Sequence, residues 1–179
     1  MIIAGVDLSL TGTGLIVLND GKVTRQELIK TKPTKSAKEE VLRLRRIVDQ
    51  LLVVIKDECP NVVIIEGMAF MARNTTALVQ LAGLNYLLRD ELVKLGIPFV
   101  IVAPTSLKKF ITGAGNTSKD QIMLHVFKKW DVTLLNDNLA DAFGLAKCGE
   151  ALIGKVGKLT QPEAEVIKLL QPQWINRDL

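Results

Sequence analysis

Residues 2–29, IIAGVDLSLTGTGLIVLNDGKVTRQELI, decide the fold class of this chain. The stretch holds three apolar or alternating runs, at 2–8, 14–19 and 22–29, each of the length and composition of a β-strand. Asn19-Asp20-Gly21 separates the last two runs and supplies the residues that a tight hairpin turn requires. The sequence therefore predicts that the fold opens with a three-stranded antiparallel meander.

The rest of the chain alternates between helical and strand-like patterns. Residues 36–59 begin with the serine and glutamate of a capping box and continue with apolar residues at helical spacing. The apolar runs 61–66 and 97–102 indicate buried strands, and 75–95 between them indicates a helix. Strands joined through helices run parallel, with the helices packed on the sheet. The expected class is α/β, with a mixed five-stranded sheet: the three-stranded antiparallel meander, then parallel strands, with helices on both faces.

The chain is expected to form one main domain. At 179 residues and 48% hydrophobic content it can fill one core but not two. Three further helices are expected after residue 103, the last over 138–152 with Asp137 or Asn138 as its cap. We expect the main domain to span residues 1–157, followed by a C-terminal helical extension or tail over 158–179.

The charge of the chain suits a polyanionic partner. The net charge is +4, and the stretch from Lys22 to Arg46 holds nine Lys or Arg and three Glu, an excess of 9 − 3 = +6. A solvated helix face explains this stretch equally well. The two cysteines, Cys59 and Cys148, form no zinc-binding pattern. Without a secretory signal or an apolar run of roughly 18 residues, a cytoplasmic protein with no membrane partner is expected.

Four carboxylates occupy positions where a metal-dependent enzyme would need them. Asp7 and Glu66 each end an apolar strand-like run, and Asp137 and Asp141 lie one helical turn apart. An acid that closes a buried strand is costly unless a cation compensates it, and a cluster of carboxylates suits Mg²⁺ or Mn²⁺. Other readings stay open for single residues, because backbone amides can satisfy Asp7, a buried lysine can pair with Glu66, and Asp137 can be a helix cap.

Four motifs surround these acids and two lysines: GVDLSLTGTG around Asp7, IIEGMAFMARN around Glu66, APTSLKKFITGAGNTSK, which contains Lys108 and Lys119, and DNLADAFGLA around Asp141. Together they resemble the conserved blocks of the RuvC-type Holliday junction resolvases. All four occur in the order of the family and span roughly residues 1–150. The resemblance implies an RNase H-like fold, a homodimer, and resolution of four-way DNA junctions by paired symmetric nicks. A small phage-encoded member would suit the divergent tail.

The resemblance carries over position by position to the acids. Asp7, Glu66 and Asp141 match the metal-binding acids of the family, whereas the usual fourth acid falls on Asn138, with Asp137 one residue earlier. Either Asp137 supplies the carboxylate, or Asn138 coordinates through its carbonyl and binds the ion more weakly. The proposed cofactor is Mg²⁺, two ions per site, with Mn²⁺ as a substitute.

The resemblance also assigns residues to DNA. Lys119 matches the catalytic basic residue beside the scissile phosphate, and Lys108 matches a second DNA-contacting lysine. Phe70 falls one residue from the position of the family's base-stacking aromatic, and Arg73 and Lys109 would contact phosphates. The alternatives are a solvated lysine at position 119 and a core phenylalanine at position 70.

Several rival functions share parts of this pattern. DLSLTGTG also resembles the phosphate loop of actin-like ATPases and sugar kinases, but this chain is too short for their two domains. A catalytically silent DNA-binding module would keep the fold, and Asn138 keeps that reading open. A nuclease that cuts forks, flaps or three-way branches is the rival nearest to a junction resolvase.

Overall fold

The computed structural model describes residues 1–68 and 75–175, without the side chains of residues 119, 120 and 175. Its centre is a five-stranded sheet with the order β3-β2-β1-β4-β5. β1 (Ile2–Asp7), β2 (Gly12–Asn19) and β3 (Lys22–Lys30) form the antiparallel meander, with Asp20 and Gly21 in the left-handed conformation of the hairpin turn. β4 (Val62–Glu66) and β5 (Phe99–Val102) continue it in parallel. The predicted mixed sheet is confirmed.

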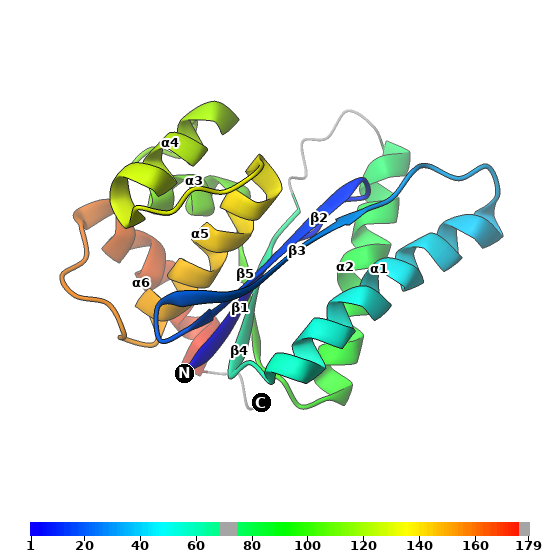
Figure 1. Ribbon diagram of the computed structural model, residues 1–179, viewed down its shortest axis with the longest axis horizontal. Helices are drawn as coiled ribbons and strands as arrows, with labels where there is room; N and C mark the ends of the chain where they lie inside the picture. The colour runs from blue at the N-terminus through cyan, green and yellow to red at the C-terminus, as the bar shows by residue number, and fades with distance from the viewer. Residues whose placement is uncertain (69–74, 176–179) are drawn as a thin grey trace.

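Helices cover both faces of the sheet, as predicted (Figure 1). α1 (Ala37–Glu58) and α2 (Thr75–Lys94) pack on one face, where Leu51 and Leu88 are fully buried. The other face carries four helices: α3 (Pro104–Thr112), α4 (Lys119–Trp130), α5 (Asp137–Leu152) and α6 (Gln161–Ile175). Among the described residues, no helix is both long and apolar enough to cross a membrane.

Glycines let α5 lie unusually close to the sheet. A Cβ on Gly5 of β1 would overlap the backbone of Ala142, and one on Gly14 of β2 would overlap the carbonyl of Asn138. At the other end of the helix, a Cβ on Gly149 would come within 2.7 Å of the Ile3 side chain. Backbone approach of this kind needs a residue without a side chain. The start of α5 is thereby fixed against the ends of β1 and β2.

The C-terminal residues 161–175 form a packed helix. Val166, Ile167 and Leu170 of α6 join the buried cluster that α5 and the sheet form. Two ion pairs link α6 to its neighbours, Lys129–Glu163 to α4 and Lys109–Glu165 to α3. α6 therefore holds α3 and α4 in place on this face of the sheet.

Candidate active site

Asp7 and Glu66 lie side by side at one edge of the sheet. In the parallel pair β1–β4, Val6 is the register partner of Ile65, so the next residues along both strands are the two acids. Successive strand residues point to opposite faces. Ile3 and Ile64 pack in the cluster under α5, so Asp7 and Glu66, an even number of residues further on, also face α5. Asp7 is only 6% exposed and Glu66 is half-buried.

The first turn of α5 brings two more acids to this edge. The helix starts at Asp137, and the side chain of Asn136 caps it by accepting a hydrogen bond from Leu139 N at 3.0 Å. The expectation that Asp137 or Asn138 is the cap was wrong by one or two residues. Because Gly5 and Gly14 let this turn press against β1 and β2, the half-buried Asp141 lies over the C-terminal end of β1.

The four acids share one edge but do not form a closed cluster. Within residues 1–68 and 75–175, no three Asp, Glu, His or Cys side chains are close enough together to hold a metal ion. Asp7, Glu66, Asp137 and Asp141 each take part in some polar or electrostatic interaction of the structure. Their backbones come from three elements that pack on one another, β1, β4 and α5. The donor set is carboxylate only, which fits a hard divalent cation.

Asn138 faces the turn between β1 and β2. A Cβ on Gly12 would lie 2.8 Å from its Nδ2 atom, so the amide packs directly on the first residue of β2. The turn itself is tightly held: Thr13 Oγ1 accepts a hydrogen bond from Ser9 N at 3.1 Å and donates to Ser9 O at 2.7 Å. The loop that follows Asp7 is therefore an ordered part of this edge.

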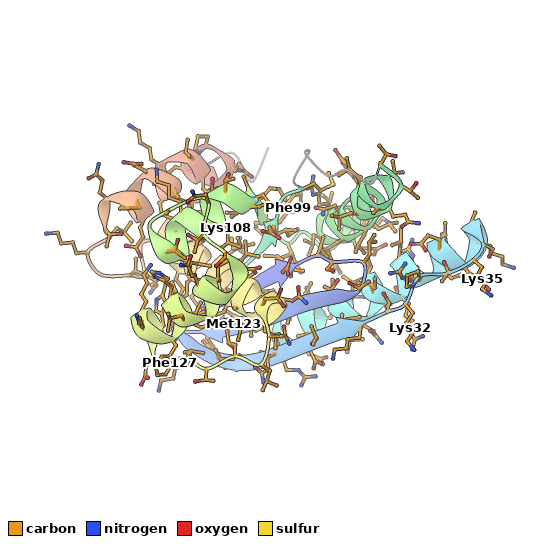
Figure 2. All side chains as sticks on the ribbon, turned by 90° about the horizontal axis from the view of Figure 1, so that it is seen from above. Lys32, Lys35, Phe99, Lys108, Met123 and Phe127 are labelled. Atoms are coloured by element: carbon orange, nitrogen blue, oxygen red, sulfur yellow. The ribbon has the colours of Figure 1, made fainter. Side chains whose placement is uncertain are left out.

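The three lysines predicted to contact DNA differ in their surroundings. Lys108 lies half-buried on α3, which begins directly after β5 and so at the same edge as Glu66, as the view onto this edge shows (Figure 2). Lys109, its neighbour, is engaged with Glu165 of α6. Lys119 is the first residue of α4, and its side chain lies outside the described part of the chain, as do Phe70 and Arg73.

Comparison with known proteins decides the family of this chain. Residues 3–149 match the model of the family described as crossover junction endodeoxyribonuclease RuvC. The chain belongs to the RuvC family. RuvC of Bifidobacterium longum subsp. infantis is 32% identical over 181 residues, which cover 97% of this chain and 91% of the relative. RuvC of Synechococcus sp. is 28% identical over 161 residues, covering 83% of this chain and 98% of the relative.

Solved structures agree with this assignment. Thermus thermophilus RuvC, in a structure with a Holliday junction substrate, matches with a TM-score of 0.68 and 26% sequence identity, over 82% of this chain and 90% of that chain. The RNase H-like fold that the motifs implied is thus confirmed. RuvC-type resolvases depend on divalent metal ions, and the carboxylate set at the sheet edge fits that requirement. The family match ends before α6, which begins at Gln161.

One buried residue near the site escaped the sequence reasoning. Arg43 was counted with the basic stretch from Lys22 to Arg46, but it is only 8% exposed. Its Nη2 donates to the carbonyl of Leu10 in the turn after Asp7, and its Nε donates to Thr31 Oγ1 at 3.0 Å. The sequence signal for this role was its place on α1, three residues after Glu40, with which it forms an ion pair at 3.2 Å.

Proposed function

We propose that this chain is a metal-dependent DNA endonuclease that resolves four-way (Holliday) junctions by paired symmetric nicks. The observation that carries the proposal is the meeting of Asp7, Glu66 and the start of α5 at one sheet edge, in a chain that matches the RuvC family throughout this region. Such a substrate places the work of the enzyme in the cytoplasm, where bacterial DNA lies.

Asp7, Glu66 and Asp141 would hold the metal, with Asp137 or Asn138 as the fourth ligand. Mg²⁺, two ions per site, is the proposed cofactor, and Mn²⁺ would substitute because it accepts the same oxygen ligands. When bound, such a pair supplies Lewis-acid activation of water and neutralises charge on the scissile phosphate. Asp7 lies on the central strand and is the most deeply buried of the four acids, so it would be a principal ligand of the metal. Cutting would leave a 5′ phosphate and a 3′ hydroxyl.

The basic and aromatic residues would position the DNA. Lys119 would offset the charge that develops on the phosphate, and Lys108 would contact the backbone beside it. Phe70 would stack on a base at the opened crossover, and Arg73 would contact a phosphate. Lys109 can join them only by giving up its ion pair with Glu165.

Resolution of a junction needs two active sites, and α2 offers the surface for a dimer. Leu84, Leu88 and Leu92 form an apolar stripe on α2 that is fully buried in the core. A different stripe faces outward: Val79, Tyr86 and Val93 recur every seven residues and are 71%, 64% and 67% exposed. Seven-residue spacing places them on one face of the helix. We infer that a second copy of the chain covers this face around a two-fold axis.

The first test is cleavage of end-labelled DNA. Four-way junctions, three-way branches, flaps and linear duplex would be incubated with Mg²⁺, Mn²⁺ or EDTA, with Asp7→Asn as the inactive control. Metal-dependent paired nicks confined to the four-way junction would support a resolvase. Equal cutting of the other branches would show a broader branched-DNA endonuclease, and binding without cutting would show a silent DNA-binding module.

A further inference from the structure

A cleft of about 700 Å³ opens beside the active-site edge, between the end of β3, the following segment and the first turns of α1. Four cationic side chains line it, the exposed Lys30, Lys32 and Arg46 and the buried Arg43, together with the hydroxyl-bearing Thr11, Thr31 and Thr34. Lysine, arginine and threonine are among the side chains that contact phosphate oxygens in DNA complexes. The chemistry of the lining therefore suits a phosphodiester.

The three exposed cations of the cleft form no ion pair with another described residue. Lys30, Lys32 and Arg46 are exposed, and among the residues that the structure describes none of them forms an ion pair. Other cations of the same stretch are paired, as in Arg25–Glu27 and Arg45–Glu91, both at 3.0 Å. The positive charge of this region is thus left uncompensated at the cleft.

The one acid that lines the cleft is already committed. Glu39 Oε2 accepts hydrogen bonds from the backbone nitrogens of Lys35 and Ser36, both at 3.2 Å, in the capping box of α1. A carboxylate that closes a capping box is held by these amides and does not have to pair with a cation across the cleft. Glu39 keeps its negative charge, but Lys30, Lys32 and Arg46 outnumber it, so the lining of the cleft is positive overall.

The floor of the cleft is hydrogen-bonded to the turn that follows Asp7. Arg43 donates to Thr31 Oγ1 and to the carbonyl of Leu10, and Thr31 Oγ1 donates to the same carbonyl at 2.5 Å. Leu10 lies three residues after Asp7. A group bound in the cleft would therefore sit at a fixed position relative to the predicted metal ligands.

The cleft and Lys108 lie on opposite sides of that edge. Thr11 precedes Gly12, which packs on Asn138 at the start of α5, so the cleft adjoins the acids. In the view onto the edge, Lys32 lies on the side of α1, whereas Lys108 lies on the side of α3 and α4, with the sheet between them (Figure 2).

We propose that this cleft binds the phosphodiester backbone of the junction arm next to the cut, through Lys30, Lys32 and Arg46. The inference rests on the proposed nuclease function and deepens it. Arg43 is a positioning residue beneath the cleft and does not touch the DNA. Because these side chains would bind phosphates, the cleft contributes to affinity and placement and does not read base sequence.

The test measures how junction binding depends on salt. Lys32→Gln, Arg46→Gln and the triple variant with Lys30→Gln would be compared with wild type in EDTA, by fluorescence anisotropy of a labelled four-way junction. Removing one cation that binds a phosphate should lower the slope of log affinity against log salt by about 0.9 in magnitude, so the slope of the triple variant should fall by about 2 to 3. The matched control is Lys168→Gln, an exposed lysine on α6.

Two results would overturn the proposal. One is an unchanged slope in the triple variant, and the other is a slope that falls as much in Lys168→Gln as in Lys32→Gln or Arg46→Gln. Cleavage by the wild-type protein tests the nuclease function independently of the binding slopes. A wild type that binds junctions without cutting them would contradict the nuclease function, while the slopes would still decide whether the cleft binds DNA.

Discussion

The side-chain amide of Gln173 hydrogen-bonds to both backbone groups of Ile101. Its Nε2 donates to Ile101 O at 3.0 Å, and its Oε1 accepts from Ile101 N at 2.9 Å. β5, which contains Ile101, is an edge strand of the sheet, and within residues 1–68 and 75–175 no strand pairs with these backbone groups on that side. The amide thus takes the place of a neighbouring strand, and α6 covers an edge that could otherwise pair with another chain.

Gln173→Glu should weaken this arrangement. A carboxylate can accept from Ile101 N but cannot donate to Ile101 O, so one hydrogen bond is removed and two oxygens are brought together. We expect the free energy of unfolding in urea to fall by about 1 to 3 kcal/mol and light scattering on heating to increase. Gln171→Glu, two residues earlier on the exposed surface, is the matched control. An equal effect of both variants would assign the destabilisation to added charge.

Glu163 should make stability depend on acid. Burial alone would raise the pKa of this carboxyl, but hydrogen bonds from Lys129 and Thr160 outweigh it and hold the pKa below its usual range. The distances are 2.7 Å from Lys129 Nζ, and 2.6 and 2.7 Å from Thr160 N and Oγ1. A group with a lowered pKa in the folded state stabilises the protein above its unfolded pKa, and this contribution is lost as the pH falls through the folded pKa.

Glu163→Gln should therefore remove part of that pH dependence. Urea unfolding from about pH 7 down to about pH 3 would show a shallower decline for the variant than for wild type. At neutral pH the variant should be less stable by about 1.5 to 3 kcal/mol, since a charged hydrogen-bonding partner is removed from a buried site. Glu165→Gln, whose ion pair with Lys109 is exposed, should change the profile less. Identical profiles for wild type and Glu163→Gln would contradict this role.

Gly14→Ala should disturb the active site through the backbone. The added Cβ would overlap the carbonyl of Asn138 and push the first turn of α5, with Asp137 and Asp141, away from β1. We expect cleavage to need more Mg²⁺ and stability to fall by about 1 to 3 kcal/mol. Gly157→Ala is the control, because a Cβ there meets nothing within 4 Å. Unchanged metal dependence in Gly14→Ala would separate the position of α5 from metal binding.

Local patterns were enough to predict the sheet and the placement of the acids. The runs around Asn19-Asp20-Gly21 formed the predicted hairpin, because alternation and turn residues act within a few positions. Asp7 and Glu66 share an edge, because parallel neighbouring strands bring their carboxyl ends together. Whether the acids bind metal stays a prediction.

Features set by distant parts of the chain could not be predicted from the sequence. The capping of α5 by Asn136 depends on how the helix meets β1 and β2, and several neighbouring polar residues fit the pattern equally well. The spacing of Glu40 and Arg43 signals an ion pair, but only the turn containing Leu10, to which Arg43 donates, explains why Arg43 is buried while Arg46 is exposed. The pairing of Gln173 with β5 joins residues 72 positions apart.

Tyr86→Glu should prevent dimer formation and so uncouple the two nicks made in a junction. Tyr86 is 64% exposed at the middle of the outward stripe of α2, so a charge there leaves the core intact but opposes burial against a second copy. We expect sedimentation to report a monomer, and junction cleavage to give single nicks in place of paired ones. Leu169→Glu on α6, 68% exposed in wild type, is the matched control and should remain dimeric. A Tyr86→Glu dimer that still makes paired nicks would place the interface elsewhere.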